Sequence, residues 1–183
     1  MQSNPPNKAK GLVVWFTGLP GAGKTTLAEA LQERFAHRKI PTCIIDGDVL
    51  RKGLCSDLGF SARDRQENVR RVGEIAKLLA EQGIVALVAL VSPYNQDRRA
   101  VRERLQPGMF CEVHVDCEVD ECRRRDPKGM YARADRGEIP QFTGVSDPYE
   151  APSAPELHLR THEESLNQSL AKLEQTVLAA IGA

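Results

Sequence analysis

Residues 18–25 read GLPGAGKT and fit the pattern G-x-x-x-x-G-K-[ST], which forms a loop that wraps around phosphate groups. The apolar run LVVWF at residues 12–16 is typical of a buried strand before the loop, and Leu27, Leu31 and Phe35 share one face of an expected helix after it. Average residue usage would give this pattern by chance in about one per cent of chains of this length. The sequence therefore predicts a site for a nucleoside triphosphate between a strand and a helix.

The residue types within this loop suit an anionic ligand. Gly21 and Gly23 allow the backbone to turn its N–H groups toward an anion, and the helix that begins there adds its positive end. The charge of Lys24 would reach the β- and γ-phosphates, and Thr25 offers a hydroxyl to Mg²⁺. We expect contacts to the nucleoside triphosphate from Gly18, Gly21, Ala22, Gly23, Lys24, Thr25 and Thr26.

Length and composition limit the classes of protein that remain. A chain of 183 residues is most simply one domain, and its 25 basic and 25 acidic residues cancel, so no overall field attracts it to nucleic acid or to an anionic membrane. The longest apolar run, residues 84–91, is too short to span a bilayer. Five scattered cysteines without a C-x-x-C pair are typical of reduced thiols in a cytoplasmic protein. We expect a flexible N-terminus over residues 1–10 and one domain over 11–183.

Strand and helix patterns alternate along the chain. Two segments, residues 61–64 and 161–164, fit the capping box, and we expect a long helix after the first and the final helix after the second. The final helix would bury one side carrying Leu166, Leu170, Leu173 and Val177. This alternation predicts a parallel sheet with helices on both faces. Besides residues 12–16, the expected strands are 41–45, 84–91, 110–115 and 157–159, and further helices are expected at 49–52 and 96–105.

Residues 123–155 contain few apolar side chains, many glycines and prolines, and no periodicity. A loop of this length inside a compact domain is usually functional, and we interpret it as a mobile lid. The guanine-reading motif N-K-x-D is absent, which argues against a GTPase, and the chain contains no additional domain for an ATPase to move. A kinase needs an acceptor pocket and a lid that excludes water, and both have candidates here.

Seven segments resemble those of adenylyl-sulfate kinases and occur in the same order. The resemblance covers about Gly11 to Leu159, with Pro20 as a departure because many members carry Ser there. The segments are 18–26, DGDVLR at 46–51, DLGFS at 57–61, DRQENVRR at 64–71, SPY at 92–94, RDPKG at 125–129 and FTG at 142–144.

The resemblance implies a fold and an activity. The fold class is α/β: a P-loop kinase-type, three-layer α/β/α domain with a five-stranded, mostly parallel sheet and a mobile lid over about residues 123–155. The activity is transfer of the γ-phosphoryl group of MgATP to the 3′-hydroxyl of adenosine 5′-phosphosulfate (adenylyl sulfate), giving 3′-phosphoadenosine 5′-phosphosulfate and ADP. ATP and Mg²⁺ are the expected cofactors.

Two carboxylates follow the expected strand 41–45, at the edge where α/β sheets bind ligands. Asp48 is our candidate for the carboxylate that lies nearest the acceptor hydroxyl and Mg²⁺, where it would orient the hydroxyl or accept its proton. Asp46 would instead cap the next turn or contact Mg²⁺ through water.

The acceptor side is assigned by resemblance. Arg51, Arg65 and Asn68 would hold adenylyl sulfate, because a guanidinium fork suits phosphosulfate oxygens; the alternative is a solvated helix face with ordinary ion pairs. Phe60 and Phe142 would clamp the substrate adenine, although a loop phenylalanine often only anchors its loop.

Four further residues complete the expected site. Lys128, in the lid, would lie near the substrate, and Arg125 along the base or phosphates of ATP; otherwise they are a charged helix end. Val91 and Ser92 would line the substrate pocket. Family members have been described with a phosphoserine at the Ser92 position, but a serine without a neighbouring base is a weak nucleophile, so we expect direct in-line transfer.

Two rival interpretations stay open. One is a kinase of the same build that acts on another small hydroxyl acceptor. The other is a non-catalytic, nucleotide-binding regulatory partner of ATP sulfurylase, against which the presence of Lys24, Thr25 and Asp48 argues. By resemblance we expect a homodimer; association with an ATP sulfurylase is left open, and no nucleic acid or membrane partner is expected.

Overall fold

The computed structural model describes residues 10–183, so the flexible N-terminus expected over residues 1–10 lies, except for Lys10, outside the described part of the chain. Five strands form one sheet in the order β2-β3-β1-β4-β5, and every pair of neighbours is parallel, which confirms the expected five-stranded parallel sheet. The strands are β1 Leu12–Thr17, β2 Thr42–Asp46, β3 Val85–Ala89, β4 Phe110–Asp116 and β5 Leu157–Arg160.

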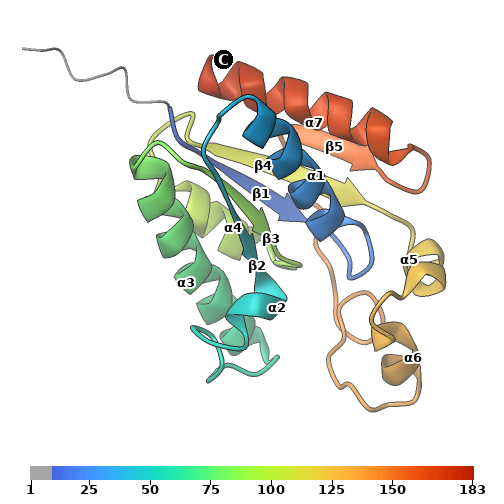
Figure 1. Cartoon of the computed structure of the whole chain (residues 1–183). Helices are drawn as coiled ribbons and strands as arrows, with labels where there is room; N and C mark the ends of the chain where they lie inside the picture. Colours follow the sequence, from blue (N-terminus) through green and yellow to red (C-terminus); the bar gives the residue numbers. More distant parts are fainter. Residues whose placement is uncertain (1–9) are drawn as a thin grey trace, which may run out of the picture.

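Helices cover both faces of the sheet, so the predicted three-layer arrangement is also confirmed. Helices α3 and α4 pack together on one face, and α1 and α7 pack together on the other (Figure 1). No helix within residues 10–183 is long and apolar enough to cross a membrane. The helices are α1 Lys24–His37, α2 Gly47–Leu50, α3 Ala62–Glu81, α4 Asn95–Arg102, α5 Val119–Arg125, α6 Met130–Asp135 and α7 Leu166–Ile181.

Strand β1 shows how the layers are built from the sequence. Its side chains alternate between the two faces: Leu12, Val14 and Phe16 join the core under α1 and α7, while Val13 and Trp15 join the core under α3 and α4. Because both faces are buried, the strand is continuously apolar rather than alternating. This burial fixes the end of β1, and with it the start of the phosphate-binding loop.

The cap of the final helix differs from the prediction. Residues 161–164 do not cap α7; the reciprocal capping box is formed by Ser165 and Gln168, four residues later. Thr161 is not free to cap, because its hydroxyl donates to the carbonyl of Ala22 (2.8 Å). The later start also leaves Leu166 exposed, whereas Leu170, Leu173 and Val177 are buried as expected. Helix α3 is capped by Ser61, as predicted. The capping box is incomplete, however, because the Asp64 carboxylate accepts from the hydroxyl of Ser61 and not from the backbone N–H of Ser61.

The predicted lid is partly helical. Residues 123–155 contain the last turn of α5 and the whole of α6, where the sequence had indicated a loop. Helix α6 is too short to show periodicity, and it is held by two local features: the Asp126 carboxylate accepts from the backbone N–H groups of Tyr131 and Ala132, and the Tyr131 ring is buried. Figure 1 shows α5 and α6 standing away from the other helices.

Candidate active site

A cleft of about 1100 Å³ lies at the carboxyl ends of β1, β2 and β3. Pockets for one small molecule usually span about 300–1,000 Å³, so this volume suits two ligands. Every residue predicted for the site except Gly18 lines the cleft. These are Gly21, Ala22, Gly23, Lys24, Thr25, Thr26, Asp48, Arg51, Phe60, Arg65, Asn68, Val91, Ser92, Arg125, Lys128 and Phe142.

The loop between β1 and α1 requires glycine at several positions. A Cβ on Gly18 would lie 2.2 Å from the carbonyl oxygen of Val115, so this residue lets β1 turn against β4 and lies behind the cleft. Gly21 and Gly23 have φ of 80° and 102°, a region that side chains disfavour, and Gly23 is the N-cap of α1. The first N–H groups of α1, which have no partner within the helix, therefore lie at the cleft, where they can donate to a phosphate.

Lys24 is buried inside this loop. Its ammonium group donates to the carbonyls of Gly18 and Leu19, both at 2.8 Å. Burial lowers the pKa of Lys24 to about 8, although Asp46 and Asp48 act in the opposite direction. A phosphate group beside Lys24 would favour its charged form and raise that pKa again.

The affinity for ATP is therefore expected to fall as the pH rises above about 8, because binding then requires uptake of a proton by Lys24. The dissociation constant of a nonhydrolysable ATP analogue should rise about fivefold to tenfold between about pH 7.5 and about pH 9, measured by calorimetry. Lys24→Arg is the control, since an arginine with a pKa above about 12 stays charged and should flatten the profile. An unchanged profile in both proteins would contradict the lowered pKa of Lys24.

The two carboxylates after β2 have different environments. Asp46 caps α2 through the backbone N–H groups of Asp48 and Val49, and its other oxygen accepts from the hydroxyl of Thr25 (2.8 Å). Asp48 is more than half exposed and forms an ion pair with Lys128 of the lid, whose pKa is raised by this contact. Asp46 thus caps the turn, which is one of the two alternatives predicted for it, and it also contacts the residue predicted to bind Mg²⁺.

The other end of the cleft is formed by the start of α3 and the loop before it. Arg51 donates to the carbonyls of Leu58 and Gly59, and its guanidinium lies 4.3 Å from the centre of the Phe60 ring. Arg65 is buried and donates to the carbonyls of Phe60 (2.9 Å) and Gln141 (2.5 Å). The arginines thus hold the substrate-side loop and the lid residue Gln141 around the cleft.

Asn68 carries an unsatisfied acceptor. Its Oδ1 is buried and finds no hydrogen-bond partner among the described residues. A buried oxygen of this kind normally has a donor, and Asn68 lines the cleft, so a ligand hydroxyl or amino group is a suitable partner.

The two predicted adenine-binding phenylalanines are not equivalent. Phe60 is about half exposed, at 47%. Phe142 is 5% exposed, and its ring meets the edge of Tyr131 at a centroid distance of 5.0 Å. Phe142 therefore anchors its loop, as the alternative for a loop phenylalanine had it, because its ring is buried against Tyr131 of α6.

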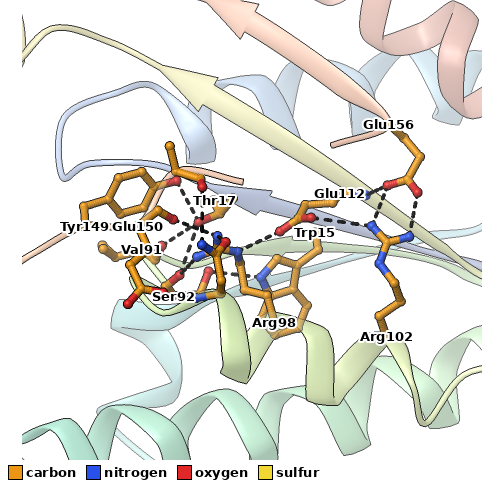
Figure 2. Close-up of polar contacts among 12 residues, drawn as sticks. Trp15, Thr17, Val91, Ser92, Arg98, Arg102, Glu112, Tyr149, Glu150 and Glu156 are labelled. Carbon is orange, nitrogen blue, oxygen red and sulfur yellow. Dashed lines mark hydrogen bonds and ion pairs between the residues drawn. The ribbon is translucent and has the colours of Figure 1, made fainter. Parts of the chain in front are cut away.

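Ser92 is buried at the end of β3, and its hydroxyl oxygen accepts from the indole N–H of Trp15 at 3.0 Å (Figure 2). An indole N–H cannot take up a proton, so this contact does not activate the serine as a nucleophile. Next to Ser92, the Val91 carbonyl accepts from the hydroxyl of Thr17 (2.8 Å).

Arg125 and the loop after β5 form the remaining side. Arg125 donates to Glu121 and to the carbonyl of Thr161, both at 2.7 Å, and the hydroxyl of Thr161 holds the loop at Ala22. Sequence reasoning missed Thr161 as a cleft residue because it was assigned to a helix cap. It also missed the buried residues Trp15, Thr17 and Arg98 and the half-buried Tyr149, which support the cleft from behind (Figure 2).

Three features together define a P-loop kinase: a glycine-rich loop around a buried lysine, carboxylates at the end of the next strand but one, and a partly helical segment beside the cleft. The model of the adenylylsulphate kinase family matches residues 10–160. The chain therefore belongs to the adenylylsulphate kinase family.

Individual relatives agree with this assignment. An adenylyl-sulfate kinase of Geotalea uraniireducens is 51% identical over 91% of this chain and 80% of its own length, and one of Vibrio parahaemolyticus is 50% identical over 88% and 78%. Among solved structures, the Mycobacterium tuberculosis APS kinase CysC in complex with AMPPNP and APS is 39% identical. It superposes with a TM-score of 0.87 over 92% of this chain and 98% of that chain.

Proposed function

We propose that this chain phosphorylates adenylyl sulfate: the γ-phosphoryl group of MgATP passes directly to the 3′-hydroxyl, giving 3′-phosphoadenosine 5′-phosphosulfate and ADP in sulfate activation. The observation that carries this proposal is one cleft with a phosphate-binding loop at one end and the buried side chains of Arg65 and Asn68 at the other. The M. tuberculosis relative, whose complex contains an ATP analogue together with APS, supports two nucleotides in such a cleft.

On the ATP side, the N–H groups of the loop and the charge of Lys24 would bind the β- and γ-phosphates. Their effect is electrostatic: as the γ-phosphoryl group leaves, charge develops on the β-phosphate of ADP, and Lys24 and the loop stabilise it. Arg125 would lie along ATP at the open side of the loop.

On the acceptor side, the Asp48 carboxylate would orient the 3′-hydroxyl and accept its proton as the new O–P bond forms and the bond to the β-phosphate breaks. Arg51 and Arg65 would hold the phosphosulfate group, Asn68 Oδ1 would accept from the ligand, and Phe60 and Phe142 would contact the adenine.

The residues at the end of β2 suit Mg²⁺. Hard cations prefer oxygen ligands, and the Thr25 hydroxyl lies against the Asp46 carboxylate, with Asp48 two residues further on. We propose that Thr25 and Asp48 hold Mg²⁺ that arrives with ATP, with Asp46 beside them; the metal would neutralise phosphate charge.

The lid is proposed to move. Lys128 pairs with Asp48, and this carboxylate would exchange that partner for the acceptor hydroxyl and Mg²⁺. Closure of residues 123–155 would then place Lys128 near the transferring group and exclude water, which would otherwise compete as acceptor.

A coupled assay of ADP release tests the function. We expect turnover with adenylyl sulfate and none with sugars or nucleoside monophosphates; turnover with one of those instead would support the rival kinase. Absence of turnover with every acceptor would support the non-catalytic regulatory partner. Calorimetry of adenylyl sulfate with and without MgADP then tests whether the two sites are coupled. The homodimer, an ATP sulfurylase association and a cytoplasmic location stay predictions.

Ser92→Ala distinguishes direct transfer from a phosphoserine intermediate. Direct transfer predicts that kcat falls by at most about tenfold, because only a hydrogen bond in the pocket wall is lost. Single-turnover kinetics with adenylyl sulfate provide the measurement. Abolished turnover with intact binding of both nucleotides would mean that the direct mechanism is wrong.

A further inference from the structure

The wall of the cleft formed by Val91, Ser92 and Pro93 has a backbone conformation that its sequence does not favour. Ser92 has φ of 41°, in the left-handed region, which is unfavourable for a residue with a side chain. The following proline further restricts its backbone. Tertiary contacts must therefore hold this wall, and residues held in this way cluster at functional sites.

Side chains behind the wall supply these contacts (Figure 2). The Thr17 hydroxyl donates to the Val91 carbonyl and is itself in contact with the Tyr149 hydroxyl (3.0 Å). The indole N–H of Trp15 donates to the Ser92 hydroxyl. The Ser92 carbonyl accepts from Nη1 of Arg98 at 2.5 Å.

Arg98 connects the parts of this arrangement. Its side chain is 2% exposed, and its guanidinium uses every nitrogen: Nε pairs with Glu112 at 2.7 Å, Nη1 donates to Ser92, and Nη2 donates to Asn95 and to the carbonyl of Glu150 (2.8 Å). A planar group with donors in fixed directions can satisfy these acceptors together, and an ammonium group cannot.

The contact to Glu150 connects the wall to the end of the lid. The backbone N–H of Glu150 donates to the Pro93 carbonyl (2.8 Å), and its carboxylate accepts from the backbone N–H of Asn95 (2.8 Å). Arg98 therefore binds both sides of the junction between the substrate wall and the segment at which the lid returns to the sheet.

We propose that Arg98 is a positioning residue for the acceptor: it fixes the wall of Val91, Ser92 and Pro93 to the base of the lid at Glu150, so that the acceptor meets a preformed surface. The inference rests on the proposed function, because it assigns this wall to the acceptor. Arg98 does not line the cleft and acts only through the residues that it holds.

The test is Arg98→Lys, with Glu112→Gln as the matched control. Lysine keeps a charge for Glu112 but loses the bridge to Ser92 and Glu150, so KM for adenylyl sulfate should rise about tenfold, the effect of one hydrogen bond to a charged group. KM for ATP should change by less than about twofold. Glu112→Gln breaks the ion pair and leaves the other contacts of Arg98, so Tm should fall by about 5 °C with KM for adenylyl sulfate unchanged.

A second readout is independent of turnover. Trp15 is the only tryptophan of the chain and contacts Ser92 directly, so its fluorescence reports on the wall. The emission of the ligand-free protein should shift in Arg98→Lys, because the loss of the hydrogen bond to the Ser92 carbonyl displaces the residue that Trp15 contacts. This separates the two proposals: a wild-type protein inactive toward adenylyl sulfate overturns the function, whereas an unshifted emission overturns the role of Arg98.

Kinetics decide the remaining outcomes. An unchanged KM for adenylyl sulfate in Arg98→Lys, or an equal rise in both KM values, overturns the proposal. If Arg98→Lys does not fold, Asn95→Ala replaces it. Asn95 is exposed, and its side chain makes one hydrogen bond to the Arg98 guanidinium and one to the base of the lid. The substitution removes both hydrogen bonds and leaves no new unpaired charge in the interior. A rise of about threefold in KM for adenylyl sulfate is then expected, and no rise overturns the proposal.

Discussion

Asp48→Asn is expected to lower kcat by about 10²–10⁴-fold, the usual contribution of a positioned acid or base. Asparagine has almost the same shape and still accepts a hydrogen bond from Lys128, but it cannot take the proton of the acceptor hydroxyl. Asp48 is more than half exposed, so the substitution removes no buried contact and should leave Tm unchanged.

Asp46→Asn is the informative comparison. An asparagine at this position still caps α2, and it still accepts from the Thr25 hydroxyl, so the fold should be retained. Its effect should appear as a higher Mg²⁺ requirement with a smaller loss of kcat. Asp48 is also a proposed Mg²⁺ ligand, so both variants should need more Mg²⁺, and they should differ in the loss of kcat that remains at saturating Mg²⁺.

Steady-state kinetics with varied Mg²⁺, together with calorimetry of both nucleotides, measure these effects. Both nucleotides should bind Asp48→Asn within about threefold of the wild-type affinity. If Asp46→Asn loses more turnover than Asp48→Asn at saturating Mg²⁺, the proton acceptor has been assigned to the wrong carboxylate.

Patterns that depend on neighbouring residues were predicted well from the sequence. The strands were identified because a parallel strand buried on both faces is continuously apolar, as in residues 84–91. The phosphate-binding loop was identified because its glycines and Lys24 are contiguous. Strand order was not predicted, since it depends on which strands meet in space and not on any one segment.

Contacts between distant segments were the ones that sequence reasoning missed. Two capping patterns lie four residues apart, at Thr161 and at Ser165, and only the bond from Thr161 to Ala22 decides between them. Arg98 belongs to a helix whose sequence is mostly polar, so one buried arginine has no local signature apart from its spacing to the buried Val101. Such residues gain their role from the tertiary structure.

Lys24→Met should lower kcat by about 10²–10³-fold, the loss typical when one preorganised charge beside the reacting group is removed. The same substitution should make the protein more stable. In the folded protein the pKa of Lys24 is lowered to about 8 by burial, compared with about 10.4 in an unfolded chain. Burial of the charged form therefore costs stability at every pH below about 8, and this cost disappears as the pH rises from about 8 to about 10.4.

Methionine fills a similar volume without a charge, so at pH 7 a gain of about 1–2 kcal/mol is expected after the loss of the hydrogen bonds to Gly18 and Leu19. For a chain of this size the gain corresponds to a Tm higher by about 2–8 °C. Calorimetric unfolding at pH 7 and at about pH 10 measures it, and the difference between wild type and variant should shrink at the higher pH. A lower Tm for the variant would show that the two carbonyl contacts outweigh the cost of the buried charge. The lower activity and the higher stability of Lys24→Met have one cause. The exclusion of water from the Lys24 ammonium strengthens its attraction to a phosphate, and it also makes the buried charge unfavourable when no phosphate is bound.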